Sequence, residues 1–556
     1  MGRLFLLVQM LVFGSSLHSQ ESWGETTHFR MDSVAAGWVR EFGSDEFPMI
    51  HFMTDVEVDA QGNLYVMGSR YSDETAEDYM LLKYAPDGTE LWEQTYNGTA
   101  NAMDLANDIV LDDDGNIYVT GSSSGVGTSS DFVTIKYWPD GTQIWTARYS
   151  ASATLGEEAN VVDLDDLGNV YVAGGSAYDY ALVKYSPEGE QLWAARYNGP
   201  DNGWDTATDM RVSNDGFAYV TGISSGGSTQ RDIATLKYNP NGNLVWARRY
   251  NGTGNTGDEA YALTIDRDDN VYVTGAIEVA DNDRNIVTLK YYPTGARAWV
   301  AIYDGPAGSF DLGHDIAVDR QGNTIVTGLS FDTAIYNSFV TIKYDSQGSR
   351  EWITRHASGG EGRSVVVDVH GDIYSTGSHL TQDMMSASIA TVKYGSDGTQ
   401  QWLMEYASPG EDCWDEPWGI ALDDFGNVYV AGIAEDMLEA QTKGLAIKYT
   451  QPDYVVSVNS RATPEDFQLF HNFPNPFNPS TQIRYELQEA GDVTLKIYNV
   501  TGREIQTLVS DYQAPGAYRV TWSGEDKFGQ LVSTGMYFAQ LRASETSGII
   551  KMTYLK

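Results

Sequence analysis

Pairs of aspartates recur along the chain and offer the clearest candidate chemistry. Four residues separate the members of each pair, which are Asp104 and Asp108, Asp205 and Asp209, and Asp311 and Asp315. Carboxylate oxygens are the ligands that Ca²⁺ prefers, and a ring of them would also attract a cationic ligand. Repeated aspartates equally serve as caps that accept backbone N–H groups in local turns. These six residues are therefore our candidate metal ligands, with Ca²⁺ as the cofactor that they imply and turn capping as the alternative.

The stretch "LDDDGNIYVTGSS" (residues 111–123) resembles a calcium loop at first sight. A loop of the form D-x-D-x-D-G needs oxygen ligands at alternate positions before the glycine. Counting back from Gly115, Asp114 and Asp112 satisfy this rule, but Val110 has no oxygen in its side chain. An aspartate that opens a turn and a glycine that closes it have a simpler explanation, because the carboxylate accepts N–H groups and glycine tolerates positive φ. The sequence predicts a turn here.

Three tryptophans form a second candidate site, for a ligand rather than a metal. Trp204, Trp414 and Trp418 lie outside the repeated pattern described below, and two of them directly precede an aspartate. An aromatic ring beside an acid suits a glycan or a peptide. The alternative is that these side chains only pack loops. The sequence contains no H-E-x-x-H, G-x-S-x-G or phosphate-loop motif, and we assign no catalytic residue.

These candidate residues belong to a unit that occurs eight times. Each copy contains a turn of Gly-Asn type, a glycine six residues later, and a Lys-Tyr pair. The glycines are Gly68, Gly121, Gly174, Gly222, Gly275, Gly328, Gly377 and Gly432. Seven of the Lys-Tyr pairs are followed by a tryptophan at a constant spacing, from Trp92 to Trp402. Recurrence in every copy favours packing between units over ligand binding for the tryptophans and the Lys-Tyr pairs.

Each unit reads as four short strands, exemplified by "NDIVLD", "NIYVTGSS", "DFVTIKYW" and "QIWTARYS". Four-stranded units of this length are typical of a β-propeller. The eighth unit lacks its tryptophan, whereas the N-terminal segment "AGWVREFG" supplies Trp38. We therefore predict an all-β fold with an eight-bladed propeller at residues 33–452, in which an N-terminal strand closes the last blade and leaves no open edge. A solenoid of sheets is the alternative, but it would not need this exchange.

The units resemble the bacterial SBBP β-propeller repeats. The resemblance lies in the patterns "VD..GN.YVTG" and "T.KY...G...W...Y.G", which recur over about residues 36–452. It implies a propeller fold and no defined reaction.

A second, small domain is predicted at residues 467–556, after a linker at 453–466. The strand candidates are "TQIRYEL", "DVTLKIYNV", "AYRVTWSG", "GMYFAQLRA" and "IIKMTYLK", as in an Ig-like β-sandwich. Together with "NFPNPFNPSTQIRYEL", this tail resembles the C-terminal sorting domain of type IX secretion cargo, which is related to the Ig-like domain of flagellar-hook capping proteins. The resemblance implies secretion machinery as a partner, through residues 467–556. A plain Ig-like accessory module is the alternative.

The N-terminus and the net charge point to export. Residues 1–20, "MGRLFLLVQMLVFGSSLHSQ", have the basic start and the apolar stretch of a signal peptide. No later apolar run is long enough to span a bilayer. A formal charge of −42 disfavours nucleic acid as a partner. The single cysteine, Cys413, permits no disulfide within the chain and has acidic neighbours that disfavour a nucleophilic role.

From these features we expect an exported protein, secreted or held at the outer surface of a bacterium. It would act as a non-catalytic binding or cell-surface interaction module for an extracellular glycan or protein. The alternative function is an extracellular glycan hydrolase or lyase that uses carboxylates at the propeller mouth. A largely structural matrix protein is a third possibility. Two close carboxylates that break the repeat and have a raised pKa would favour the enzyme.

Overall fold

The computed structural model describes most of the chain from residue 34 onward. The described ranges are 34–42, 51–72, 74–254, 256–280, 283–332, 336–356, 359–381, 386–409, 412–437, 441–451, 467–470, 472, 477, 480–487, 490–499, 503–528, 530–543 and 546–554. The signal peptide predicted at 1–20 and the linker predicted at 453–466 lie outside these ranges. All elements within them are β-strands.

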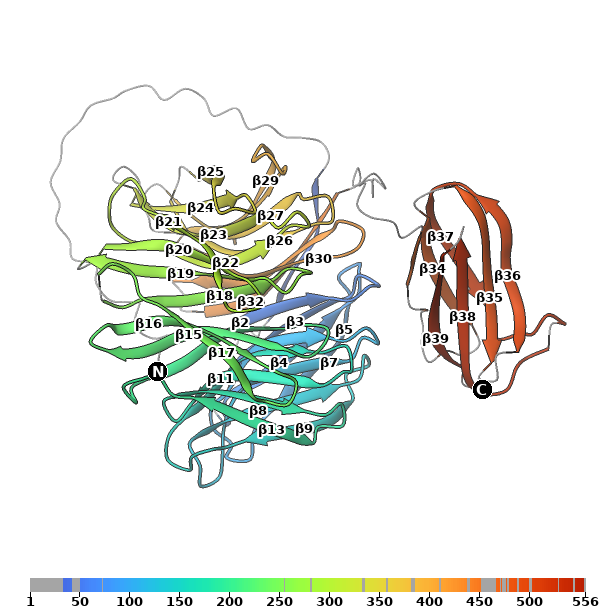
Figure 1. Cartoon of the computed structure of the whole chain (residues 1–556), viewed down its shortest axis with the longest axis horizontal. Coiled ribbons are helices and arrows are strands. Elements are labelled where there is room, and N and C mark those ends of the chain that lie inside the picture. The colour runs from blue at the N-terminus through green and yellow to red at the C-terminus, as the bar shows by residue number, and fades with distance from the viewer. Residues whose placement is uncertain are drawn as a thin grey trace.

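The described strands before residue 452 form six four-stranded antiparallel sheets and one eight-stranded sheet (Figure 1). The first two sheets contain β2 (His51–Val58), β3 (Leu64–Ser72), β4 (Ala76–Tyr84) and β5 (Glu90–Tyr96), and then β6 (Asp104–Leu111), β7 (Ile117–Ser124), β8 (Ser130–Tyr137) and β9 (Gln143–Tyr149). The next two contain β10 (Glu157–Leu164), β11 (Val170–Ser176), β12 (Asp179–Tyr185) and β13 (Gln191–Tyr197), and then β14 (Asp205–Val212), β15 (Ala218–Gly227), β16 (Gln230–Tyr238) and β17 (Leu244–Tyr250). The last two contain β18 (Glu259–Ile265), β19 (Val271–Ala280), β20 (Asp283–Tyr291) and β21 (Arg297–Tyr303), and then β22 (Asp311–Val318), β23 (Thr324–Asp332), β24 (Tyr336–Tyr344) and β25 (Arg350–Arg355).

The eight-stranded sheet contains two four-stranded groups. One group is β26 (Gly362–Val367), β27 (Ile373–Leu380), β28 (Ala387–Tyr394) and β29 (Gln400–Tyr406). The other is β30 (Cys413–Leu422), β31 (Val428–Asp436), β32 (Gln441–Thr450) and β1 (Ala35–Phe42). A single parallel β-bridge, between Ala387 and Trp414, joins the groups into one sheet, so that they are two separate repeats packed side by side.

The first strands of the repeats form a closed ring. They contact one another in the order β2, β6, β10, β14, β18, β22, β26 and β30, and β30 contacts β2 again. The prediction about the N-terminal strand is confirmed, because β1 pairs antiparallel with β32 and lies fourth in the last group. A ring arranged in this way places the first strands around its axis, where the candidate carboxylates stand.

The glycine found in every repeat has a steric cause. At Gly121 a Cβ atom would lie 2.0 Å from the carbonyl oxygen of Leu105 on the first strand, and at Gly328 it would lie 1.9 Å from that of Leu312. These glycines stand opposite a β-bulge of the first strand, between Ala106 and Asp108 in the second repeat. The bulge brings the two backbones closer than a side chain permits, so only glycine fits.

The C-terminal part forms its own two sheets (Figure 1). One contains β33 (Phe467–Leu469), β34 (Thr481–Leu487) and β37 (Gly516–Trp522), and the other β36 (Glu504–Gln513), β35 (Gly491–Asn499), β38 (Gly535–Ala543) and β39 (Thr546–Tyr554). Trp522, Ile483 and Leu541 are fully buried between them, which is the core of a sandwich. The sequence prediction missed β33 and β36.

Candidate functional site

The aspartate turn of the repeat is fully occupied by the chain itself. In the second repeat, Asp112 Oδ1 accepts the backbone N–H groups of Asp114 at 3.0 Å and Asn116 at 2.9 Å. Its Oδ2 accepts the side-chain amide of Asn116 at 2.7 Å and the hydroxyl of Tyr118 at 3.0 Å. Gly115 has a φ of +77°. These contacts are those of the predicted turn and not those of a calcium loop.

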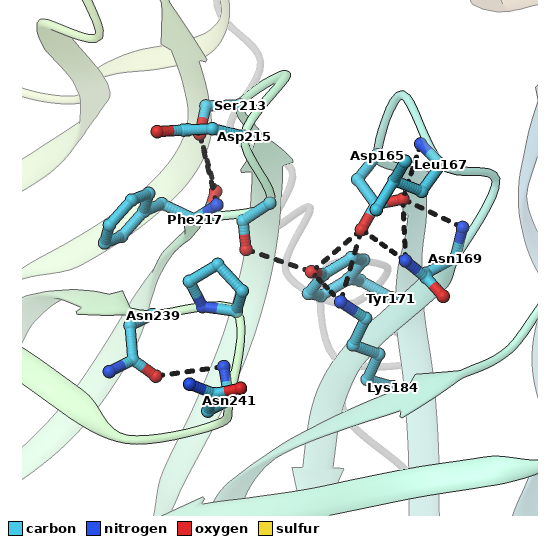
Figure 2. A network of polar contacts seen from close by, with 12 residues as sticks. Asp165, Leu167, Asn169, Tyr171, Lys184, Ser213, Asp215, Phe217, Asn239 and Asn241 are labelled. Carbon is cyan, nitrogen blue, oxygen red and sulfur yellow. Dashed lines mark hydrogen bonds and ion pairs between the residues drawn. The ribbon is translucent and has the colours of Figure 1, made fainter.

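A wider cluster, which we call the turn unit, joins each turn to the next repeat. In the third repeat it consists of Asp165, Tyr171, Lys184 and Trp193, and Figure 2 shows the first three with the following turn. The Tyr171 hydroxyl lies 3.2 Å from Asp165 Oδ2 and 2.9 Å from the carbonyl oxygen of Gly216 in the fourth repeat (Figure 2).

Lys184 and Trp193 complete the turn unit. Lys184 Nζ lies 3.2 Å from Asp165 Oδ2 and 4.5 Å from the centre of the Tyr171 ring. The Trp193 ring meets the Tyr171 ring edge-on at 5.9 Å, and its Nε1 donates to the carbonyl oxygen of Pro240 at 3.0 Å. The tryptophans and Lys-Tyr pairs therefore pack one repeat against the next, as their recurrence predicted.

The first aspartate of each candidate pair is a buried cap. Asp104 accepts the N–H of Gly98 at 2.5 Å, Asp205 that of Gly199 at 2.7 Å, and Asp311 that of Gly305 at 2.6 Å. All three carboxylates are fully buried. Burial raises the pKa of Asp104 and of Asp311 above the ordinary value for aspartate. The bonds to backbone N–H groups match the turn-capping alternative, and none of the three carboxylates faces solvent.

The second aspartate of each pair connects neighbouring first strands. Asp108 Oδ2 accepts the backbone N–H of Val162 at 2.7 Å, Asp209 Oδ2 that of Leu263 at 2.6 Å, and Asp315 Oδ2 that of Val365 at 2.8 Å. Each of these bonds crosses from one repeat to the next. The first and the second aspartates of the pairs thus lie in different environments. The described ranges contain no group of three or more His, Cys, Asp or Glu side chains arranged to hold a metal ion.

Carboxyl groups on the first strands shift one another's pKa around the ring axis. Burial raises the pKa of Asp55 to about 6, although its hydrogen bond to Asp108 acts against this. Burial and the charge of Asp55 raise the pKa of Asp108, and burial and the charge of Asp108 raise that of Glu57 to about 7. Burial thus favours the protonated form of both carboxyls in the Asp55–Asp108 pair.

One arginine faces this acidic group. Arg211 Nη1 lies 3.0 Å from Asp209 Oδ1, and the charges of Asp209, Asp163 and Asp108 raise its pKa above the ordinary value for arginine. Asp163 Oδ2 also accepts the N–H of Val212 at 2.7 Å. The sequence analysis missed Glu57, Asp163 and Arg211. Side chains two residues apart on a strand share a face, so the alternation of Asp55 with Glu57 and of Asp209 with Arg211 was the available signal.

The three candidate tryptophans do not form one site. Trp204 precedes β14, and 44% of its side chain is exposed. Trp414 and Trp418 lie on β30, which is not a ring neighbour of β14. Trp414 Nε1 donates to Glu416 at 2.7 Å, and the Arg363 guanidinium stacks over the Trp418 ring at 4.9 Å. Trp414 and Trp418 therefore have partners within the chain, and only Trp204 presents an open aromatic surface.

His314, and the Cys413 that the sequence analysis disfavoured as a nucleophile, both have partners or neighbours within the fold. His314 Nδ1 lies 2.8 Å from the carbonyl oxygen of Gly362 on the next first strand, and burial lowers its pKa. Cys413 is buried, and burial together with the charge of Asp415 raises the pKa of its thiol. A raised pKa disfavours the thiolate and hence a nucleophilic role.

Family comparisons match three segments of the chain. Residues 95–127 match the SBBP β-propeller repeat, and residues 113–143 match the β-propeller domain of unknown function DUF5122. Residues 478–547 match the FlgD Ig-like domain. A search of curated proteins found no match. In the described part of the chain, no helix is long and apolar enough to cross a membrane.

Two of the similar solved structures are a bacterial surface protein and an archaeal β-propeller domain. PorZ, an essential bacterial surface component of the type IX secretion system of Porphyromonas gingivalis, is 12% identical over 90% of this chain and 74% of its own, with a TM-score of 0.36. The β-propeller domain of the trilobed protease from Pyrococcus furiosus is 9% identical over 63% of this chain and 97% of its own, with a TM-score of 0.36. Scores this low carry no argument about function. The family matches thus identify an SBBP-type β-propeller repeat at residues 95–127 and a FlgD Ig-like domain at residues 478–547.

Proposed function

We propose that this chain is an exported bacterial protein whose propeller is a non-catalytic binding or cell-surface interaction module. In this proposal the propeller has eight blades and occupies residues 33–452, and the Ig-like domain at 467–556 directs secretion or surface attachment. The protein is secreted or held at the outer surface. A type IX route is the specific form that the tail favours, through its resemblance to sorting domains.

The observation that supports a non-catalytic propeller is the use of its carboxylates. The candidates for metal or acid–base chemistry, such as Asp108, Asp209 and Asp315, each accept a backbone N–H of the neighbouring repeat. A carboxylate engaged in this way positions strands and has less freedom to approach a substrate. In this proposal a ligand binds at a surface where the residues of one repeat differ from those of its neighbours.

The role of the C-terminal domain is tested by localisation. Full-length protein and a variant that ends at Gln451 are expressed in the native bacterium, and the medium, cell surface and periplasm are assayed separately. We expect the full chain in the medium or on the surface and the truncated chain in the periplasm. A cooperative melting transition of the truncated protein serves as the control for folding. Equal distribution of the two proteins would overturn the sorting role.

A glycan hydrolase or lyase is the second candidate, and one observation favours it. Asp55 and Asp108 are hydrogen-bonded carboxylates with raised pKa, and the repeat supplies no such pair elsewhere in the described ranges. A raised pKa suits the acid of a glycosidase, although the two carboxyl groups of such enzymes stand about 5–9.5 Å apart and Asp55 contacts Asp108 directly. A reducing-sugar assay on extracellular polysaccharides with the wild type and Asp55→Asn separates the candidates. We expect no activity in either protein, and activity that Asp55→Asn abolishes would establish the enzyme.

A further inference from the structure

The sixth repeat lacks the tyrosine of the turn unit. The tyrosines at this position in the other repeats are Tyr65, Tyr118, Tyr171, Tyr219, Tyr272, Tyr374 and Tyr429. Ile325 takes the place in the sixth, and its register is unchanged, because Ile325 lies opposite Lys343 as Tyr171 lies opposite Lys184. The isoleucine side chain is shorter than that of tyrosine, so the outer part of the ring and the hydroxyl have no counterpart in the sixth repeat.

A cavity of about 510 Å³ lies at this turn unit, between the sixth and seventh repeats. Its lining includes the other members of this turn unit, Asp319, Lys343 and Trp352, and the following Gly371.

The groups that a tyrosine would contact are still in place. Asp319 Oδ2 accepts the side-chain amide of Asn323 at 2.8 Å and lies 3.4 Å from Lys343 Nζ, but no tyrosine hydroxyl contributes. The side chains of Asp319 and Lys343 are 2% and 4% exposed, so this is a buried ion pair at the cavity wall. The Trp352 indole retains its bond to the carbonyl oxygen of Ser396 and its contact with Tyr394.

Other departures from the repeat gather at this cavity. Glu351 stands directly before Trp352, where Leu91, Ile144, Leu192, Val245 and Ala298 stand in the first five repeats. Ser396 stands where those repeats have a proline, such as Pro139 or Pro240. Both residues line the cavity, as does His370 of the next turn. Comparable changes occur beside the retained Tyr374, where Gln401 precedes Trp402 and Gln451 takes the place of the proline, so the loss of the tyrosine is what distinguishes the sixth repeat.

The complete turn units show which chemical group this space accommodates. In six of them a tyrosine hydroxyl contacts the turn aspartate, at 2.8 Å in the fifth repeat and at 3.2 Å in the third. The ammonium group lies 4.5–5.0 Å from the ring centre, at 4.5 Å for Lys184 and 5.0 Å for Lys393. The tryptophan meets the ring edge-on at about 6 Å. Figure 2 shows the hydroxyl and ammonium contacts in the third repeat.

We propose that the cavity between the sixth and seventh repeats binds a para-hydroxyphenyl group supplied by a ligand. The phenol hydroxyl donates to Asp319 Oδ2, the ring lies beneath the Lys343 ammonium group and the Trp352 edge contacts it. The group belongs either to a small phenolic molecule or to an exposed tyrosine of a partner protein. This inference rests on the proposal that the propeller is a binding module, but it is independent of the export route.

The test uses 4-methylphenol, which is the side chain of tyrosine, with toluene as the control that lacks the hydroxyl. Binding to the purified full-length protein is followed by ligand-observed NMR and by the melting temperature. We expect saturable binding of 4-methylphenol, at least tenfold weaker binding of toluene, and a melting temperature that rises only with 4-methylphenol.

Ile325→Tyr is the decisive variant because it restores the side chain of the other repeats. We expect it to fold, to melt at or above the wild-type temperature, and to bind 4-methylphenol at least tenfold more weakly. Binding that Ile325→Tyr leaves unchanged, or no saturable binding by the wild type, would overturn the proposal. Glucose is tested in parallel, and saturable glucose binding with none of 4-methylphenol would identify a saccharide site instead.

Two further measurements ask whether the para-hydroxyphenyl group comes from a small molecule or from a partner protein, and whether loss of the tyrosine alone creates a binding site. N-acetyltyrosinamide and a tyrosine-containing peptide are compared with 4-methylphenol; tighter binding of the peptide favours a partner protein, and weaker binding favours a small molecule. Tyr171→Ile, in a repeat that keeps Leu192 and Pro240, is expected to gain weak 4-methylphenol binding. These outcomes do not depend on where the protein is located, so failure here leaves the sorting experiment unaffected.

Discussion

Lys448 on β32 lies directly opposite Trp38 on β1, in the register in which Lys83 lies opposite Trp92 within the first repeat. Trp38 Nε1 also donates to the carbonyl oxygen of Pro86, as Trp92 Nε1 does to that of Pro139. The N-terminal strand thus reproduces the register and the indole hydrogen bond of an ordinary fourth strand, although it comes from the other end of the chain.

The first prediction concerns this closure. Trp38→Ala removes a side chain that is 8% exposed and packs against Tyr84 and Tyr429. We expect the free energy of unfolding to fall by about 3 kcal/mol, as for other buried tryptophans. Urea denaturation measures the change. Trp138→Ala, at a side chain that is 50% exposed, is the control and should cost less than about 1 kcal/mol. Similar losses in both variants would argue against a structural closure.

The second prediction concerns the glycine column. Gly121→Ala would place a Cβ atom 2.0 Å from the carbonyl oxygen of Leu105, so the two strands must separate. We expect a loss of about 3 kcal/mol in the free energy of unfolding, measured by thermal denaturation. Gly127→Ala is the matched control, because its φ of +85° strains an alanine but no atom lies within 4 Å. That variant should lose about 1 kcal/mol, and the reverse order of the two losses would contradict the steric explanation.

The third prediction is a decrease of stability with rising pH. Burial and the nearby Asp108 raise the pKa of Glu57 to about 7, so the folded protein binds this proton more tightly than the unfolded chain does. The favourable contribution is complete below the unfolded pKa of 4.5 and is lost as the pH rises through 7.

Glu57→Gln should remove part of this dependence and stabilise the protein above pH 7 by about 1–2 kcal/mol. Urea denaturation at pH 5, 6, 7 and 8 measures the slope. Asp113→Asn, at an exposed position of a turn, is the control and should leave the slope unchanged. An unaltered slope in Glu57→Gln would show that the carboxyl is ionised in the folded protein.

The fourth prediction addresses calcium. The candidate ligands divide into buried caps and cross-strand carboxylates, and the described ranges show no cluster arranged for a metal. Calorimetric titration of the propeller with Ca²⁺ at pH 7.5 should therefore show no saturable site at micromolar concentrations. A saturable heat that disappears in Asp209→Asn, but persists in the control Asp113→Asn, would restore the calcium interpretation.

Much of the architecture was predictable because the repeat itself carries the information. The alternating strands, the turn at Asp112 and the fourth-strand role of the segment around Trp38 all follow from comparing copies of the repeat. In the C-terminal domain the strand β36 was missed, because "EIQTLVSDYQ" mixes charged and apolar residues without regular alternation.

The candidate site was predicted less well, for a physical reason. An aspartate at a fixed place in each repeat looks the same whether it caps a turn, as Asp104 does, or faces an open space. Only the positions of backbone N–H groups distinguish these cases. The loss of tyrosine at Ile325 was visible in the sequence, but its meaning depends on Trp352 and Lys343 remaining around the gap.

The pairing of β1 with β32 has a consequence for biogenesis. Of the strands that the structure describes, β1 is synthesised first, yet its partner β32 ends at residue 450. The ring therefore cannot close on a chain that stops short of this residue. Until then β1 has an unpaired edge that chaperones or proteases can reach.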